Sequence, residues 1–243
     1  MIRPRAAMLL AAGLGTRMRP LTEHTAKPLL PLGGRTLLDH ALDRLAAAGV
    51  ELVVVNAHWH ADRVAGHLAA RDAGGPEIIV RREAALLDTG GAVAAALGQI
   101  GEAPFYVVNG DTVWLDGPTP ALRRLAGAWD GANDVVLLVH RTFQVHAEIG
   151  AGDFAIDSLG RARRRRPAEI VPYIYAGIQL VSPALFAGAA AGPFSFNVLW
   201  DRAIARDRLR AVVHDGLWFH LSTPADLAEA ESLLQARVLG DSR

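Results

Sequence analysis

A short apolar run, residues 6–12, leads directly into the glycine-rich segment Gly13-Leu14-Gly15-Thr16-Arg17. A run of this length that ends in glycine is typical of a buried strand followed by a tight turn. The glycines allow several backbone N–H groups to point into one concavity, where they can hold phosphate oxygens. The residues predicted to form this phosphate-binding turn are Leu10, Ala12, Gly13, Gly15 and Thr16.

Two cations flank the turn. Arg17 ends the glycine-rich segment, and Lys27-Pro28 follows ten residues later. A guanidinium offers a planar fork and an ammonium a point charge, and both bind phosphate. Together with the turn they are what binding a nucleoside triphosphate requires. The plainer alternative is that the glycines only shape a turn and the cations are solvated, and for a Gly-x-Gly pair alone that alternative is favoured.

Strand-like and helix-like segments alternate through the first half of the chain. The pattern predicts helices over residues 36–48, 61–70 and 89–97, and strands over 51–56, 77–80 and 104–109. This alternation predicts an α/β fold with a Rossmann-like, mainly parallel sheet flanked by helices. Because ligands bind beyond the carboxyl ends of such strands, the glycine-rich turn and Gly110-Asp111 are expected to meet at one edge.

The second half of the chain is richer in strands. The pattern predicts strands over residues 134–141, 154–157, 173–181, 210–214 and 218–221, and helices over 183–191, 197–206 and 223–238. The arginine run 163–166 is expected to be a solvated loop or a strand edge. Since no linker or internal repeat interrupts the pattern, a single domain is expected over residues 1–243.

Composition narrows the classes of function. Lys plus Arg and Asp plus Glu each number 25, and this neutral balance argues against general binding to nucleic acid or membrane surfaces. The chain has no cysteine, which excludes disulfides and thiolate metal sites. No apolar run approaches the roughly 20 residues that span a bilayer, and no signal peptide is recognisable. We expect a cytoplasmic protein with small-molecule partners, as a monomer or a small homo-oligomer.

The joint pattern G-x-G-T-R-M-x-P-L-T followed by K-P-L, in residues 13–29, resembles the signature of the sugar-1-phosphate nucleotidyltransferases. The resemblance implies the nucleotide-diphospho-sugar transferase fold, in which residues 1–112 bind the nucleotide and 113–243 the sugar. It also implies attack by a sugar-1-phosphate oxygen on the α-phosphorus of a nucleoside triphosphate, with pyrophosphate leaving. The lysine that matches Lys27 lies against the α-phosphate and the sugar phosphate in that family, and the match of Arg17 grips the departing phosphates.

Asp111 is the metal candidate. It ends Val108-Asn109-Gly110-Asp111, which resembles the family's metal-binding motif, although a turn aspartate is the alternative. The family's second metal carboxylate lies in a W-x-D-x-G-T pattern. Residues 218–223 read WFHLST instead, which puts His220 at that position. Mg²⁺ prefers oxygen ligands, whereas imidazole suits Mn²⁺ or Zn²⁺ better.

Three explanations of His220 stay open. Asp111, phosphates and water hold Mg²⁺ alone, or the enzyme prefers a softer ion such as Mn²⁺, or activity is weakened. The first is favoured, because Mg²⁺ commonly keeps several waters and binds substrate phosphates. His220 remains a candidate ligand, with a packing or hydrogen-bonding role as the alternative.

The base is expected near Glu83 and the segment Leu87-Asp88-Thr89-Gly90-Gly91. In this interpretation the Glu83 carboxylate accepts the uracil N3–H, and backbone groups near Gly90 meet the uracil oxygens. The alternative is that Asp88 or Thr89 only caps the next helix, although capping and base contact are compatible. Together with Asn56-Ala57-His58-Trp59, the segment most resembles the N-acetylmuramate-1-phosphate uridylyltransferases of cell-wall recycling, which implies UTP as the donor. The sugar is expected against Asn109, Gly150, Asp153 and Gly177.

Three other functions stay open. The first is guanylyl or cytidylyl transfer to another sugar phosphate. Guanine and cytosine would present to Glu83 a different hydrogen-bonding edge from that of uracil. A dinucleotide dehydrogenase is disfavoured, because Met18 replaces the third glycine of that fingerprint and Asp39 lies within a helical pattern. A non-catalytic nucleotide-sugar sensor is supported only by His220 and is opposed by the intact phosphate-binding motif.

Overall fold

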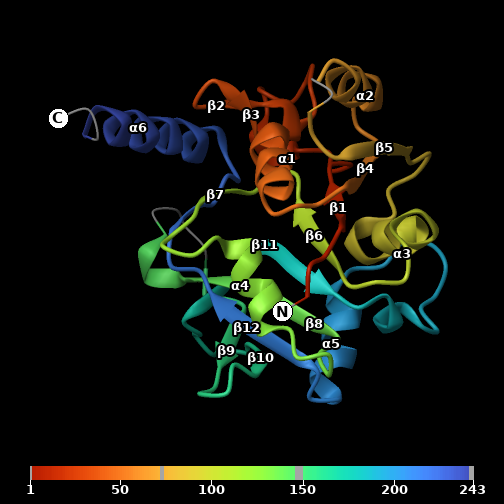
Figure 1. Cartoon of the computed structure of the whole chain (residues 1–243). Coiled ribbons are helices and arrows are strands. Elements are labelled where there is room, and N and C mark those ends of the chain that lie inside the picture. The colour runs from red at the N-terminus through yellow and green to blue at the C-terminus, as the bar shows by residue number, and fades with distance from the viewer. Residues whose placement is uncertain (1, 72–73, 146–149, 241–243) are drawn as a thin grey trace.

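A nine-stranded sheet runs through the computed structural model, which describes residues 2–71, 74–145 and 150–240 (Figure 1). Its strands are Ala6–Leu10 (β1), Leu52–Ala57 (β4), Glu77–Arg82 (β5), Phe105–Asn109 (β6), Val135–Arg141 (β8), Phe154–Ile156 (β9), Ala162–Arg164 (β10), Tyr173–Val181 (β11) and Leu209–Val213 (β12). The order is β10-β9-β11-β6-β1-β4-β5, and β8 and β12 continue the sheet beyond β11. Two small sheets pair Pro31–Leu32 (β2) with Arg35–Thr36 (β3), and Val113–Leu115 (β7) with Leu217–Phe219 (β13).

The strand directions agree with the predicted fold class. β1 lies between β4 and β6 and is parallel to both, and β5 extends this parallel set. β11 is antiparallel to its neighbours β6 and β8, while β12 is parallel to β8. The α/β fold with a mainly parallel sheet is therefore confirmed, and every antiparallel pairing of this sheet involves β9 or β11, in the β-rich second half.

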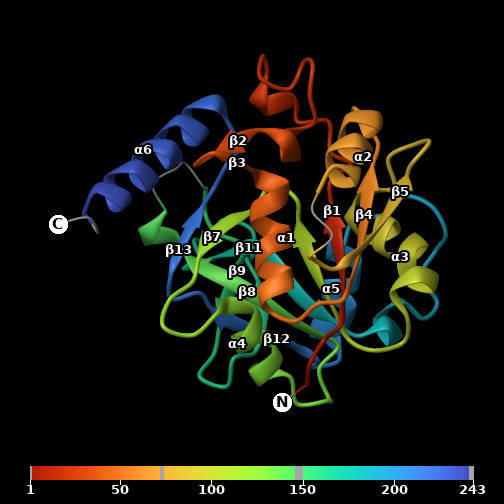
Figure 2. The ribbon, with the colours of Figure 1, turned by 45° about the horizontal axis from the view of Figure 1, so that its top comes forward.

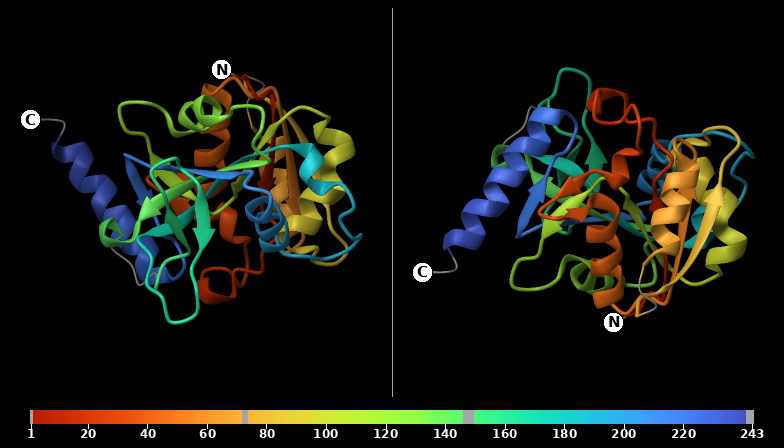
Figure 3. Two further views of the ribbon diagram at one scale, coloured as in Figure 1. Left: turned by 90° about the horizontal axis from the view of Figure 1, so that it is seen from below. Right: turned by 90° about the horizontal axis from the view of Figure 1, so that it is seen from above.

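Helices cover both faces of this sheet (Figures 2 and 3). They are Leu37–Ala47 (α1), Ala61–Ala69 (α2), Asp88–Ile100 (α3), Ala121–Ala128 (α4), Asn197–Ala205 (α5) and Pro224–Gly240 (α6). Successive strand residues point to opposite faces, so the buried strands supply two cores. Leu9 packs in one core with side chains of α1, α2 and α4, and its neighbour Met8 packs in the other with side chains of α3 and α5.

One predicted helix, over residues 183–191, is wrong. Only a single 3₁₀ turn forms there, Pro183–Phe186, started by Ser182, whose side chain accepts from the Ala184 N–H. Gly188 and Gly192 have φ values of 68° and 99°, which break any longer helix. The sequence pattern also predicts no element for α4, β2, β3 or β7. β10 overlaps the arginine run 163–166, for which a strand edge was one of two alternatives, and the other predicted elements are present with shifted ends.

The last helix, α6, begins against the body of the protein and extends away from it (Figures 1 and 2). Its residues Leu227 and Ala230 join a small core with Leu32, Leu37 and Phe219. Among the described residues, no helix is long and apolar enough to cross a membrane.

Candidate active site

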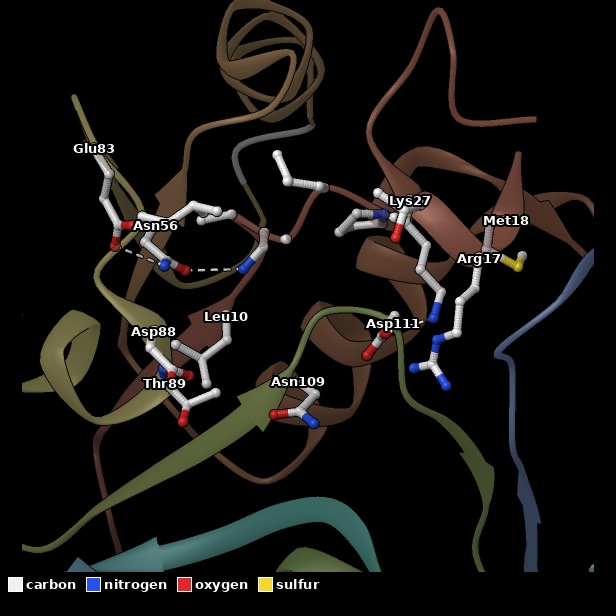
Figure 4. Close-up of a pocket in the computed structure, with 18 of the residues that line it drawn as sticks. Leu10, Arg17, Met18, Lys27, Asn56, Glu83, Asp88, Thr89, Asn109 and Asp111 are labelled. Carbon is white, nitrogen blue, oxygen red and sulfur yellow. Dashed lines mark hydrogen bonds and ion pairs between the residues drawn. The ribbon is translucent and has the colours of Figure 1, made fainter. Parts of the chain in front are cut away.

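Three neighbouring parallel strands end level with one another. Leu10, the last residue of β1, is in register with Asn56 of β4 on one side and Asn109 of β6 on the other. Residues paired across a sheet share a face, and Figure 4 shows Leu10 between the two asparagines. The glycine-rich segment and Gly110-Asp111 leave the sheet from this edge, so the topology brings these two motifs together.

A cavity of about 550 Å³ lies over this edge of the sheet. The predicted residues in its wall are Leu10, Ala12, Gly13, Gly15, Thr16, Arg17, Lys27, Glu83, Thr89, Asn109 and Asp111. Figure 4 shows Arg17, Lys27 and Asp111 at one end of the cavity and Glu83 and Thr89 at the other. The cavity thus separates a charged end from an end that carries hydrogen-bonding side chains.

At the charged end, Lys27 and Asp111 form an ion pair. Lys27 Nζ lies 2.6 Å from Asp111 Oδ2, and the two side chains are 11% and 38% exposed. Lys27 is also the only lysine of the chain, because every other one of the 25 Lys and Arg residues is an arginine. Arg17 is exposed and forms no ion pair with any of the described side chains, so its guanidinium is available to a ligand.

The loop between these cations folds back on itself. Gly15 has a φ of +63°, and a Cβ there would lie 3.0 Å from Thr22 Cγ2 and 3.2 Å from Lys27 Cβ. Thr22 Oγ1 donates to the Gly15 carbonyl over 2.8 Å. Glycine at 15 therefore allows both the left-handed turn and the close approach of the segment that carries Lys27.

At the other end, a buried chain of hydrogen bonds holds Glu83. Asn56 Nδ2 donates to Glu83 Oε1 over 2.8 Å, and the Leu87 N–H donates to Glu83 Oε2 over 3.3 Å. Asn56 Oδ1 accepts from the Ala11 N–H over 2.8 Å. Sequence reasoning did not single out Asn56 as a site residue. The available signal was that Asn56 ends an apolar strand in the same way as Asn109.

Gly90 lies outside the wall of the cavity. Its N–H donates to the Phe194 carbonyl over 2.9 Å, and a Cβ at Gly90 would collide with the Phe194 ring. The Gly90 N–H therefore has a partner within the protein, and the contact of other backbone groups near Gly90 with a base stays a prediction. Thr89 does line the cavity, and its Oγ1 accepts from the Phe196 N–H over 2.9 Å.

Gly150 and Asp153, predicted to bind the sugar, also lie outside the cavity wall. Gly150 is exposed. Asp153 Oδ2 accepts from the Tyr175 N–H over 2.9 Å, which ties it to β11. The intervening Gly152 has a φ of +77°, and a Cβ there would collide with the Val171 carbonyl. Asp153, and not Gly150, thus ties the chain just before β9 to the start of β11.

Gly177 stands immediately behind Asn109. The register between β11 and β8 shifts between Tyr175 and Ile178, which makes a bulge at Gly177. A Cβ on Gly177 would lie 2.5 Å from Thr112 Oγ1 and 3.2 Å from Asn109 Nδ2. Gly177 thus supports the cavity wall without being part of it.

His220 lies beside the charged end but lines a second cavity of about 320 Å³. His220 Nε2 is 2.9 Å from the Oγ of Ser222, which does line the main cavity. Burial lowers the pKa of His220, and among its charged neighbours Asp226 acts against this effect while Lys27 and Arg17 add to it. His220 is thus a hydrogen-bonding partner of the cavity wall.

The donor set fits a hydrated hard cation. No cluster of three or more His, Cys, Asp or Glu residues is present within the described ranges, so the protein offers no closed metal cage there. Asp111 Oδ1 is left free by the ion pair, which occupies Oδ2. Mg²⁺ typically binds through one or two carboxylates, substrate phosphates and water. Asp111 would be the carboxylate ligand in such a site.

Comparisons with known proteins show the family of this chain. Residues 7–219 match the family described as the MobA-like NTP transferase domain. The chain is 41% identical to an N-acetylmuramate alpha-1-phosphate uridylyltransferase of Caulobacter vibrioides, over 95% of this chain and 97% of that relative. A protein of the same name from Neisseria meningitidis serogroup B is 32% identical over 95% and 98% of the two chains.

Solved structures show the same fold. A UDP-glucose pyrophosphorylase complexed with UDP-glucose superposes with a TM-score of 0.81 at 16% identity, covering 98% of this chain and all of the other. The inositol-1-phosphate CTP transferase of T. maritima superposes with a TM-score of 0.77 at 20% identity, covering 95% and 96%. The chain therefore belongs to the nucleotidyltransferases with a MobA-like NTP transferase domain, together with the N-acetylmuramate alpha-1-phosphate uridylyltransferases that it matches along its length.

Proposed function

We propose that this nucleotidyltransferase transfers a uridylyl group from UTP to N-acetylmuramate 1-phosphate, giving UDP-N-acetylmuramate and pyrophosphate. The observation that carries the proposal is that one cavity holds Lys27 and Asp111 at one end and Glu83 at the other. A triphosphate at the charged end places its base toward Glu83. The 41% identity to a relative that bears this activity in its name supports the choice of substrates.

In the proposed reaction, an oxygen of the sugar phosphate attacks the α-phosphorus of UTP. A new P–O bond forms as the bond from the α-phosphorus to the bridging oxygen breaks, and pyrophosphate leaves with that oxygen. Lys27 Nζ neutralises charge on the α-phosphate and the incoming phosphate, and the free Arg17 guanidinium pairs with the departing pyrophosphate. The sequence resemblance supports both roles.

A divalent cation completes the proposed charge balance. Bound Mg²⁺ supplies positive charge at the phosphates, and Asp111 would be its protein ligand. Because His220 is hydrogen-bonded to Ser222, we propose that it orients this hydroxyl in the cavity wall. Mn²⁺ is the alternative ion if His220 turns toward the metal.

For the acceptor, we propose that Asn109 contacts the sugar. Its amide faces the cavity and is hydrogen-bonded to no other described residue, whereas Gly177 supports it from behind. Residues 1–112 then supply the nucleotide contacts and Asn109, and 113–243 supply the second half of the sheet, including Gly177 behind Asn109. A role in recycling cell-wall sugars in the cytoplasm follows from these substrates.

The direct test is pyrophosphate release by the purified protein over a grid of the four common nucleoside triphosphates and several sugar 1-phosphates. Release with UTP and N-acetylmuramate 1-phosphate alone is the expected result, and repeating the grid with Mn²⁺ tests the metal. Release with GTP or CTP and another sugar phosphate would correct the substrates. If no pair of substrates released pyrophosphate while the protein still bound nucleotide, the result would favour a non-catalytic nucleotide-sugar sensor.

A further inference from the structure

We propose that Asn56 is a positioning residue for base selection, which holds the Glu83 carboxylate so that the site accepts only bases with a ring N–H on the pairing edge. The inference rests on the proposed function, because it assumes that Glu83 faces the base. It adds Asn56 to the residues that select the base. It also gives a reason for an asparagine near the end of β4, in register with Leu10 of β1.

The orientation of the Asn56 amide is fixed from both sides. Its Oδ1 accepts from the Ala11 N–H, and a backbone N–H can only donate. The Nδ2 group is therefore directed toward Glu83 Oε1, which it contacts at 2.8 Å. Asn56 is 3% exposed and Glu83 is 8% exposed, so water competes little for either group. If the Asn56 amide were flipped, its NH₂ group would face the Ala11 N–H and its oxygen would face Glu83 Oε1. Neither buried pair could then form a hydrogen bond.

This fixed amide determines what Glu83 offers to a ligand. One carboxylate oxygen accepts from Asn56 and the other from the Leu87 N–H. A carboxylate held by two donors can still accept a further hydrogen bond from a ligand in the cavity. Uracil N3–H and guanine N1–H donate to such an acceptor. The corresponding ring nitrogens of cytosine and adenine carry lone pairs instead, so a cytosine or adenine in the same pose meets an unpaired acceptor.

Asn56 also joins the two ends of the cavity. Ala11 is the first residue after β1 and leads into the glycine-rich segment, whereas Glu83 follows β5. Asn56, the penultimate residue of β4, stands between them because it is hydrogen-bonded to both. A single side chain thus fixes the base-facing carboxylate relative to the start of the phosphate-binding turn. A purely structural asparagine would support both segments without affecting which base is bound.

The test is calorimetric titration of the protein with UTP and with CTP, with Mg²⁺ and without a sugar phosphate, so that no turnover occurs. We expect the wild-type protein to prefer UTP, and Asn56→Ala to reduce the ratio of UTP to CTP affinity by about tenfold, as loss of a hydrogen bond to a charged group implies. Asn56→Asp should reduce the ratio at least as far, because it sets a second carboxylate against Glu83.

Asn133→Ala is the matched control. Asn133 is 2% exposed and its Nδ2 donates to the Ala128 carbonyl, outside the cavity. We expect it to leave the ratio of affinities unchanged even if it lowers Tm. The double variant Asn56→Ala/Glu83→Gln should have nearly the same ratio of UTP to CTP affinity as Glu83→Gln alone, because Asn56 acts through Glu83.

The outcomes separate the inference from the proposed function. If the wild-type protein uses UTP but Asn56→Ala keeps the full ratio of UTP to CTP affinity, the positioning role is wrong and the proposed function stands. An equal drop in both affinities would show a structural role and also overturn the inference. A wild-type preference for CTP or ATP, in binding and in pyrophosphate release, would overturn the proposed donor and the inference with it.

Discussion

Replacing Gly177 by alanine tests how the β11 bulge supports the active site. The φ of Gly177 is +77°, and a left-handed backbone costs an alanine about 1–2 kcal/mol. The added Cβ would lie 2.5 Å from Thr112 Oγ1. Displacing that hydroxyl weakens its 2.9 Å hydrogen bond to the Ala176 carbonyl, a loss of about 1 kcal/mol. We expect the free energy of unfolding to fall by about 2–3 kcal/mol and Tm by about 4–12 °C.

Gly49→Ala separates the backbone cost from the collision. Gly49 follows α1 with a φ of +81°, and a Cβ there meets no atom within 4 Å. The free energy of unfolding of this variant should fall only by the cost of a left-handed alanine, about 1–2 kcal/mol. Urea unfolding and thermal melting of both variants provide the comparison. Equal losses in Gly177→Ala and Gly49→Ala would refute the argument that the Thr112 contact matters.

The same pair of variants links the bulge to binding. The Cβ at Gly177 would also lie 3.2 Å from Asn109 Nδ2, so this amide must shift. We expect Gly177→Ala to raise KM for the sugar phosphate even at a temperature where the protein is fully folded, and Gly49→Ala to leave KM unchanged. An unchanged KM in folded Gly177→Ala would remove Asn109 from the proposed sugar contacts.

Three further predictions follow from charge, packing and burial. Lys27→Arg keeps the charge but should lower kcat in pyrophosphate release by at least about 100-fold, because a guanidinium does not fit the buried 2.6 Å contact of Nζ with a carboxylate. Gly91→Ala should lower the free energy of unfolding, measured in urea, by about 2–3 kcal/mol, because the added Cβ collides with the Gly192 carbonyl. Gly98→Ala in the same helix is the control. Its Cβ meets open space, so this variant should be as stable as the wild type or more stable. Burial lowers the pKa of His214 below 6.5 in the folded protein, so below that pH the unfolded chain binds more protons than the folded one. The free energy of unfolding in urea should therefore fall as the pH is lowered, by up to about 1.4 kcal/mol per pH unit. The fall should end below the pKa of His214 in the folded protein.

Much of the first half of the fold could be predicted because each element is self-contained in the sequence. α1 begins at Thr36, whose side chain accepts from the Asp39 N–H, and is followed by Gly49, so its start and stop signals are local. The apolar runs of β1, β4 and β6 are buried on both faces and stand out for that reason. The three residues of β10 are too short to show a period, whereas α4 does carry a helical pattern, with Leu122, Leu125 and Ala126 buried, that the sequence analysis did not use.

The site was predictable where its residues belong to one local motif. Arg17 and Lys27 are close in sequence to the glycine-rich turn, and Asp111 follows a strand that ends at the same edge. Asn56 and Glu83 are 27 residues apart, and their pairing depends on the register of β4 with β1 and on the end of β5. Gly150 and Asp153 were expected at the sugar, yet Asp153 hydrogen-bonds β11, a contact across 22 residues that no local pattern reports.

The single lysine shows what only the structure could add. Arginine supplies every other one of the 25 Lys and Arg residues, so composition alone would favour arginine at position 27 as well. Arg17 is exposed and has room for a guanidinium fork, which suits a departing pyrophosphate. Lys27 is 89% buried by side-chain area, its exposed share being 11%, and its ammonium meets Asp111 head-on at 2.6 Å. A compact point charge fits that space, which explains lysine there and arginine at position 17 in one cavity.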